Sequence, residues 1–337
     1  MASATGSELI VLTCASGRQC SQIIPLLYQT PSPASPRPAL RLVVNSEKSR
    51  ARLMEQYPDA QVVRANLQVP QECAAVVDGA TTVFYVGPPF HPYEITMGMN
   101  MIDAAVTEES HRHQQQQQQQ QQGNRVADSS LSSPSKFSFV HFVFSSALHP
   151  EASKLLHHDQ KRQIEEYLTE SGLSYTILQP STFMDNFIGQ LLSQRDSSSS
   201  TGTFMAPFNP AVRDHAEVAV KVVRERERHF FATYQLVSTL PMTTVEYVDS
   251  IGAVLGKRFD VKRIPFEQAA DMFVQITWGD GDVDQAFRDA PERMLLYYNS
   301  RGLLGNPGIL EWLLGRKPTT PADLARLRLK EGGLADK

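Results

Sequence analysis

The feature that most constrains the fold is an alternation of short apolar runs with amphipathic stretches. The runs at 9–13 (LIVLT) and 82–86 (TVFYV) have no polar face, which is typical of strands buried on both sides. The stretch 155–171 has instead the apolar spacing of a helix and is followed by Gly172. This alternation predicts right-handed βαβ units, and hence an α/β fold with a doubly wound parallel sheet.

The same patterns place the individual elements along the chain. The expected strands cover residues 9–13, 40–44, 61–65, 82–86, 137–144 and 175–178. The expected helices cover 21–28, 49–56, 71–77, 95–107, 155–171, 211–228, 244–255 and 266–278, and another begins at Thr320–Pro321. Because the alternation loosens near Phe183, we expect residues 1–190 to form the sheet domain. Residues 191–337 would be a smaller, mostly helical region that covers the carboxyl edge of the sheet and does not fold independently.

Three segments have the composition of exposed loops. The largest, at about 108–136, contains nine consecutive glutamines and a serine-rich stretch, and it predicts a disordered insert. A tolerated surface insertion is the favoured interpretation of the glutamine tract, and an interaction segment is the alternative. The other two loops are Pro-rich at 30–38 and Ser-rich at 195–202.

Composition excludes several classes of protein. Three cysteines in 337 residues cannot form a disulfide scaffold, and a net charge of −4 argues against a generic nucleic-acid binder. No apolar run reaches the length of about 18 residues that spanning a membrane requires. The N-terminal apolar stretch lacks the basic residues of a signal peptide, so we expect a cytoplasmic protein, or a nuclear one if it is a regulator.

Several polar residues fall where parallel strands end, and the carboxyl ends of such strands meet at one edge. The turn after the first strand, 13–20, has the single glycine Gly17, which by itself is a weak phosphate-binding signal. Ser145 and Ser146 end another strand. His157 and Lys161 share one face of the following helix, where Lys161 could bond a ribose and lower the pKa of a neighbouring group. Pairing of Lys161 with Glu165 on a solvated face is the slightly favoured alternative.

The remaining histidines and charges carry little signal. His91 lies on a loop above the expected crevice, where a substrate contact is less favoured than an incidental position. The histidines at 141, 149, 157 and 158 lack the spacing of metal ligands, so no metal is expected. The mixed-charge run 224–228 indicates a solvated helix face rather than a nucleic-acid surface.

At several places the chain resembles the NmrA-like family, which consists of atypical short-chain dehydrogenases/reductases that are common in fungi. The matching stretches are CASGRQC, LVVNSEKSR, FYVGPPFHPYE, HFVFSSALHP, KLLHHDQKRQIEEYLTESGLSYTILQPSTFMDNF and WLLGRKPTTPADLARL. The resemblance covers nearly the whole chain outside the glutamine insert, and it is most specific around 154–187. It implies an NAD(P)-binding Rossmann fold with a C-terminal substrate region.

The resemblance also implies a set of cofactor-binding positions. The family turn GxxGxxG corresponds here to Cys14, Gly17 and Cys20, and we expect the two cysteines to be small packing residues rather than a redox pair. The absence of an acidic residue at the end of the second strand favours NADP over NAD. The full expected set is Cys14, Ala15, Ser16, Gly17, Arg18, Gln19, Asn45, Ser46, Ser49, Arg50, Asn66, Leu67, Tyr85, Val86, Gly87, Lys161, Gln179, Pro180, Ser181, Thr182 and Phe183.

For catalysis, the family's Tyr-x-x-x-Lys unit corresponds to His157-x-x-x-Lys161. We expect Lys161 to orient the nicotinamide ribose, His157 to donate a proton and Ser146 to anchor the substrate. The leading hypothesis is an NADP-dependent oxidoreductase that reduces a carbonyl, imine or enone of a small molecule, by resemblance in fungal secondary metabolism. A non-catalytic NAD(P) sensor that regulates a protein partner, such as a transcription factor, is the alternative. A fold that no longer binds dinucleotide is a third reading.

Overall fold

The computed structural model describes residues 8–29, 37–123, 140–193, 201–202, 211–261, 264–279 and 284–331. Within these residues, seven parallel strands form one sheet in the order β3-β2-β1-β4-β5-β6-β8. The strands are β1 (Leu9–Leu12), β2 (Ala39–Val44), β3 (Gln61–Arg64), β4 (Thr82–Val86), β5 (His141–Ser145), β6 (Ser174–Pro180) and β8 (Ala232–Leu236). The predicted doubly wound sheet is therefore confirmed, with its topological switch between β1 and β4.

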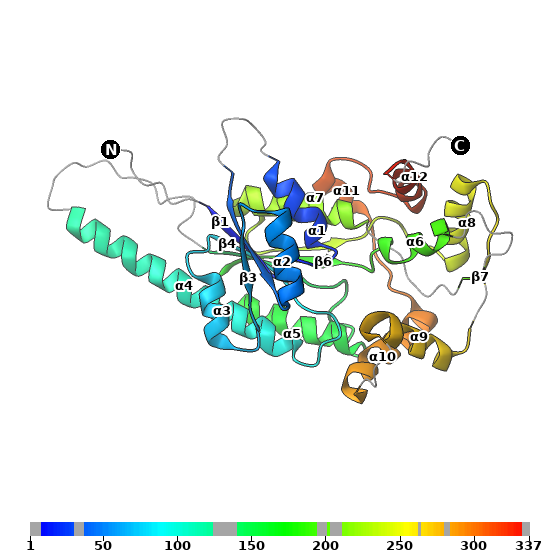
Figure 1. Cartoon of the computed structure of the whole chain (residues 1–337), viewed down its shortest axis with the longest axis horizontal. Helices are drawn as coiled ribbons and strands as arrows, with labels where there is room; N and C mark the ends of the chain where they lie inside the picture. The colour runs from blue at the N-terminus through cyan, green and yellow to red at the C-terminus, as the bar shows by residue number, and fades with distance from the viewer. Residues whose placement is uncertain are drawn as a thin grey trace.

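Helices cover both faces of the sheet, and each face has its own apolar core (Figure 1). One face carries α1 (Cys20–Tyr28), α2 (Glu47–Gln56), α7 (Val212–Glu225) and α11 (Gly308–Leu314). The other carries α3 (Pro70–Val77), α4 (Glu94–Gly123) and α5 (Leu156–Glu170). Every residue of β1, β4 and β5 is buried, which explains why these strands have no polar face.

The sheet extends past the expected boundary at residue 190. Helix α7 packs against α1, and β8 pairs with β6 as the last strand of the same sheet, so residues 212–236 belong to the sheet layers. The β8 sequence gave no strand signal because this edge strand is only half buried, without a continuous apolar run.

The remaining C-terminal helices form two small groups beyond the carboxyl edge (Figure 1). Helices α6 (Asp185–Ser193), α8 (Thr244–Leu255) and α12 (Pro321–Glu331) share one apolar core. Helices α9 (Phe266–Trp278) and α10 (Gln285–Arg301) pack against each other in the second group. A short pair of strands, β7 (Thr201–Gly202) and β9 (Asp260–Val261), completes this mostly helical region.

The first part of the expected insert is helical rather than a disordered loop. Helix α4 continues from Glu94 through the glutamine tract to Gly123 and projects beyond the other helices in Figure 1. Its first half is anchored in the core by Met97 and Met101, and glutamine is a good helix former, so a helix nucleated there propagates into the tract. Residues 124–136 of the expected insert, and most of the other two loops, lie outside the described residues.

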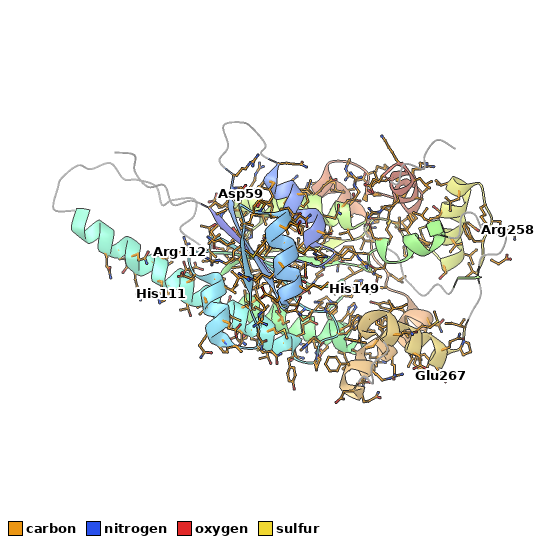
Figure 2. The ribbon with its side chains drawn as sticks, in the orientation of Figure 1. Asp59, His111, Arg112, His149, Arg258 and Glu267 are labelled. Carbon is orange, nitrogen blue, oxygen red and sulfur yellow. The ribbon has the colours of Figure 1, made fainter. Side chains whose placement is uncertain are left out.

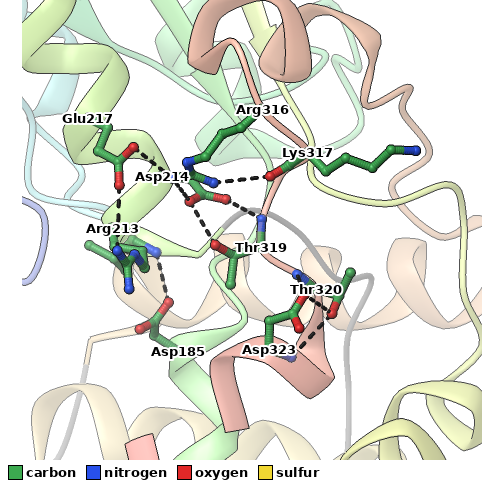
Figure 3. A network of polar contacts seen from close by, with 10 residues as sticks. Asp185, Arg213, Asp214, Glu217, Arg316, Lys317, Thr319, Thr320 and Asp323 are labelled. Carbon is green, nitrogen blue, oxygen red and sulfur yellow. Dashed lines mark hydrogen bonds and ion pairs between the residues drawn. The ribbon is translucent and has the colours of Figure 1, made fainter. Parts of the chain in front are cut away.

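A polar network ties the C-terminal segment to α7 (Figure 3). The fully buried Asp214 carboxylate accepts hydrogen bonds from Arg316 Nη2 at 2.9 Å, from the Thr319 backbone N–H at 2.6 Å and from the Thr319 hydroxyl at 2.8 Å. Nearby, Asp185 accepts from the Val212 N–H at 2.8 Å. These contacts fix the approach to α12 before its cap, where the predicted Thr320 bonds the Asp323 N–H at 3.2 Å.

Among the helices of the described residues, none combines the length and the apolar character needed to cross a membrane.

Candidate functional site

The turn between β1 and α1 is held tightly against the neighbouring strands. The Thr13 hydroxyl donates to the Val86 carbonyl at 2.9 Å and accepts from the Val86 N–H at 2.7 Å. The Gly17 N–H donates to the Cys14 carbonyl at 2.8 Å, and a Cβ on Gly17 would lie only 3.0 Å from that oxygen. The turn therefore favours glycine at position 17. It presents its backbone at the N-terminus of α1, where anions bind readily.

Cys14 occupies the left-handed region, with a φ of 48°. The turn therefore has a positive φ at a position where the residue is not glycine. Burial, reinforced by the nearby Glu94 carboxyl, raises the pKa of the Cys14 thiol to about 11. Burial also raises the pKa of Cys20, whose thiol donates to the Thr13 carbonyl at 3.4 Å. Both thiols are protonated and unreactive at neutral pH, as expected of packing residues rather than a redox pair.

A substitution series at Cys14 tests this backbone strain. We expect Cys14→Val to lower the free energy of unfolding by about 2 kcal/mol, because a β-branched residue is poorly tolerated at positive φ. Cys14→Gly should change it by less than about 1 kcal/mol, since relief of strain offsets the extra freedom of glycine when unfolded. Urea denaturation of both variants measures the difference, and equal losses would contradict a left-handed Cys14.

The predicted residues after β2 are mostly engaged with one another. The Ser46 hydroxyl caps α2 by accepting from the Ser49 N–H at 3.2 Å, and it donates to the Ser49 hydroxyl at 3.0 Å. Arg50 pairs with Glu47 at 2.7 Å on the surface. The arginine that reaches the first turn is Arg52, which the sequence analysis did not select. Its guanidinium donates to the Ser16 carbonyl at 3.3 Å.

Arg52 and Ser16 also line a cavity of about 180 Å³ between α1 and α2. Its other lining residues are Ala15, Ser21, Ile24, Leu53, Gln56 and Tyr57. A sequence signal for Arg52 did exist, because it lies three residues after Ser49 and therefore near it on one helix face.

Asn66 and Leu67, after β3, are bound by their own turn and by the helices α3 and α4. The Asn66 side chain accepts from the Gln68 N–H at 3.1 Å, and its backbone N–H donates to Glu72 at 2.8 Å. The buried Leu67 accepts from the Asn100 amide at 3.0 Å through its carbonyl.

Lys161 is buried in an ion pair that the sequence analysis did not foresee. Its Nζ lies 2.6 Å from Glu94 Oε1, and the two side chains are 9% and 0% exposed. Glu165, the expected alternative partner, instead accepts from the Gln179 amide at 3.0 Å. The solvated pair of Lys161 with Glu165 is therefore wrong. Burial raises the pKa of Glu94, and the Lys161 ammonium opposes this increase.

His157 lies one helical turn before Lys161 and is almost completely buried. Its ring packs at 4.7 Å from the Phe90 ring and 4.4 Å from the His158 ring. Burial holds the pKa of His157 well below its usual range, so the imidazole is neutral. Its Nδ1 has no hydrogen-bond partner among the described residues, which is unusual for a buried polar atom.

His158 has a structural role. Its two nitrogens contact the His149 carbonyl at 3.1 Å and the Tyr298 hydroxyl at 3.0 Å, and burial lowers its pKa to about 4. His149 in turn lies 2.7 Å from the Leu304 carbonyl through Nε2, so α5 and the segment after α10 are joined at this point (Figure 2).

The two serines at the end of β5 face different sides of the sheet. The Ser145 hydroxyl donates to Gln19 Oε1 at 2.7 Å and lies 3.2 Å from His215 Nε2 on α7. Ser146 is buried, and its hydroxyl, like the Gln179 amide, counteracts the rise that burial causes in the pKa of Glu165. The structure thus brings Ser146 to the α5 side, together with Lys161.

The segment after β6 places polar and aromatic side chains at the same edge. The Ser181 hydroxyl is buried and has no partner among the described residues, and Thr182 contacts Tyr298. The Phe183 ring packs edge-on at 5.4 Å from the ring of His215. His215, like Glu94 and Arg52, was missed by the sequence analysis. Its signal was a histidine on the apolar face of α7.

His215 predicts a measurable pH dependence. Burial lowers its pKa to about 3, so the folded state keeps it neutral while the unfolded chain binds a proton below about pH 6.5. Its contribution to stability is present above pH 6.5 and is lost as the pH falls toward 3. The slope of the unfolding free energy against pH gives the number of protons taken up on unfolding. We expect His215→Gln to reduce this number by close to one between pH 6 and 4. Urea denaturation across this pH range measures it, and parallel curves would contradict the expectation.

Within the described residues, no three His, Cys, Asp or Glu side chains gather into a group that could hold a metal ion. The predicted residues that do meet at the carboxyl edge are the first turn, Gly87, Ser146, His157, Lys161 and the segment after β6. Of those after β2 and β3, Ser46, Ser49, Arg50, Asn66 and Leu67 make the contacts with neighbouring residues described above.

Comparisons with known proteins identify relatives of this arrangement. The model of the NmrA-like family matches residues 111–319. Among curated proteins, none matches the sequence. The fold is similar to triphenylmethane reductase of Citrobacter sp. complexed with NADP(H), with a TM-score of 0.69 and 18% identity over 94% of this chain and 99% of that one.

Two further structures are similar. The NADPH-dependent quinone oxidoreductase of Escherichia coli complexed with NADPH has a TM-score of 0.68 and 18% identity over 95% of this chain and 99% of that one. NmrA, a negative transcriptional regulator in complex with NAD, has a TM-score of 0.65 and 12% identity over 98% of this chain and 99% of that one. At these identities, the likenesses establish the fold alone.

Proposed function

The chain belongs to the NmrA-like family, and from that premise we propose that it is an NADP-dependent oxidoreductase acting on a small organic molecule. The observation that carries the proposal is the buried ammonium of Lys161 at the carboxyl edge, beside the first turn. Burying a lysine there costs the hydration free energy of its ammonium. A lysine with a structural role at the surface would not lose this hydration, so the burial points to a functional site.

The residues at this edge fit a dinucleotide. The first turn offers backbone N–H groups next to the small residues Ala15, Ser16 and Gly17. Buried polar atoms without partners among the described residues lie along the ends of β4, α5 and β6, namely Tyr85 OH, His157 Nδ1 and Ser181 Oγ. Such atoms normally find a partner, so a ligand with several hydroxyl and amide groups would satisfy them.

Each proposed catalytic residue has one role. A bound NADPH would supply the hydride. Lys161, with one N–H directed at Glu94, keeps two for ribose hydroxyls. Neutral His157 can donate a proton from one ring nitrogen. The buried Ser146 can form a hydrogen bond with the oxygen of a carbonyl or enone, or with the nitrogen of an imine.

A cofactor titration followed by a substrate panel tests the proposal. Thermal shift and intrinsic fluorescence should report saturable binding of NADPH, with NADH binding more weakly. Incubation with quinones, aldehydes, imines and enones should then consume NADPH steadily with at least one substrate class. Failure to bind either nucleotide would overturn the proposal.

Arg52 provides a prediction about cofactor preference. Its guanidinium lies beside the cavity at Ser16, where a 2′-phosphate would follow the adenine ribose. We expect Arg52→Gln to weaken NADPH binding about tenfold, and to leave NADH binding within about twofold, because only NADPH has the phosphate. Arg50→Gln is the matched control, since Arg50 is paired with Glu47. Fluorescence titration of both nucleotides compares the variants, and equal losses for NADPH and NADH would refute the assignment.

One observation favours a second candidate function, that of a non-catalytic NAD(P) sensor acting on a protein partner. His157 lies beneath the Phe90 ring, and Phe90 is itself at a φ of 63°, so the nearest proton donor is shielded. Nucleotide binding without consumption of NADPH on any substrate class would support the sensor over the enzyme.

A further inference from the structure

Lys161 forms an ion pair with Glu94 that joins α5 to α4. The sequence patterns pointed to Lys161 but not to Glu94. Glu94 is the first residue of α4, so its carboxylate lies at the positive end of that helix. Lys161 approaches from α5, and its ammonium lies 5.6 Å from the centre of the Phe144 ring. The lysine is thereby fixed from two sides, by a carboxylate and by an aromatic face.

Gly87, at the end of β4, is shaped around this carboxylate. A Cβ at position 87 would lie 2.7 Å from Glu94 Oε1 and 3.2 Å from its Cγ. A side chain at position 87 would displace the end of the Glu94 side chain, so glycine directly after β4 leaves room for this carboxylate beside Lys161. Gly87 has no positive φ that would favour glycine, so the contact that a larger residue would disturb here is the one with Glu94.

The neighbouring carboxylate does not compete for the lysine. Glu165 lies one helical turn beyond Lys161 on α5, but both its oxygens bond the Gln179 amide. The second oxygen of Glu94, Oε2, is buried without a partner among the described residues. The Glu94 carboxylate is thus committed to Lys161 at one oxygen only.

We propose that Glu94, packed against Gly87, is a positioning residue that holds the Lys161 ammonium in place for the cofactor ribose. The contact of Lys161 with a cofactor ribose rests on the proposed function. The contact of Glu94 with Lys161 is present in the chain itself. Removing the carboxylate leaves the ammonium buried and uncompensated, so Lys161 loses its proton more easily and its geometry relaxes.

The test uses two readouts on the full chain. The first is competitive acylation of lysines by acetic anhydride without nucleotide, followed by mass spectrometry of the peptide with Lys161. We expect Glu94→Gln to raise the reactivity of Lys161 at least tenfold at pH 8, because the free amine reacts and the ammonium does not. The second is the dissociation constant of NADPH from fluorescence titration, which should rise at least fivefold. Glu94→Asp keeps the charge at a longer distance, so it should produce smaller changes in both readouts.

Glu108→Gln is the matched control. It removes another carboxylate of α4, which is 11% exposed and pairs with Arg112 at 2.9 Å, away from Lys161. We expect neither readout to change. Unchanged reactivity of Lys161 in Glu94→Gln would overturn the inference, and so would unchanged NADPH affinity or a control that reproduces both effects. Failure of the wild-type chain to bind NADPH would instead overturn the proposed function and the cofactor half of the inference, while acylation still decides whether Glu94 holds Lys161.

Discussion

Asp214→Asn is expected to lower the free energy of unfolding by about 3 kcal/mol. The carboxylate is fully buried and accepts from Arg316 and twice from Thr319. The amide that replaces it can accept through only one atom and turns N–H groups toward a donor, so at least one buried group loses its partner. Breaking a buried, hydrogen-bonded ion pair from one side costs about 3–5 kcal/mol, and partial exposure of Arg316 places the estimate at the lower end.

Glu217→Gln is the control for this variant, because Glu217 also pairs with Arg316, at 2.6 Å, but is 35% exposed. A surface pair contributes about 1 kcal/mol or less. Urea denaturation compares the two variants, and hydrogen exchange of α12 should accelerate only in Asp214→Asn, since Thr319 leads into that helix. Equal losses in the two variants would show that Asp214 does not fasten the C-terminal segment.

How much of the fold was predictable depends on where each element lies. Strand β4 matches its expected range because burial on both faces leaves an unbroken apolar run. Helix α8 also matches its range, and it begins with a reciprocal cap between Thr243 and Glu246 and ends at Gly256. Strand β8 was missed because an edge strand half exposed to water carries no such pattern.

Site residues were predicted where their position follows from a nearby strand in the sequence. They were missed where their position depends on how distant elements pack together. The turn at Gly17 follows β1, and Lys161 lies near the start of the helix that comes after β5, so the edge on which they lie could be inferred. The partner of Lys161 could not, because Glu94 is 67 residues away and reaches it only when α4 and α5 pack side by side. Glu165 was the nearer candidate by helical spacing. The contact between Ser46 and Ser49 at the start of α2 was likewise not foreseen, and their role in cofactor binding stays a prediction.

Lys161→Met is expected to abolish function more completely than any other single change at the edge. The methionine keeps most of the apolar stem but removes every N–H that could bond a ribose hydroxyl. Loss of orientation of the bound cofactor should reduce NADPH consumption by about 100-fold or more. Glu94 would remain fully buried without its ammonium, which should lower the free energy of unfolding by about 3 kcal/mol even without nucleotide.

Lys221→Met separates these effects from the general loss of a partly buried lysine. Lys221 Nζ donates to the Leu313 carbonyl at 2.9 Å on the opposite face of the sheet. Losing that bond should cost about 1 kcal/mol and leave NADPH consumption unchanged. Urea denaturation and NADPH consumption measured on both variants decide the matter. If Lys161→Met retained consumption close to that of the wild type, Lys161 would have no part in the reaction, and the buried pair with Glu94 would be purely structural.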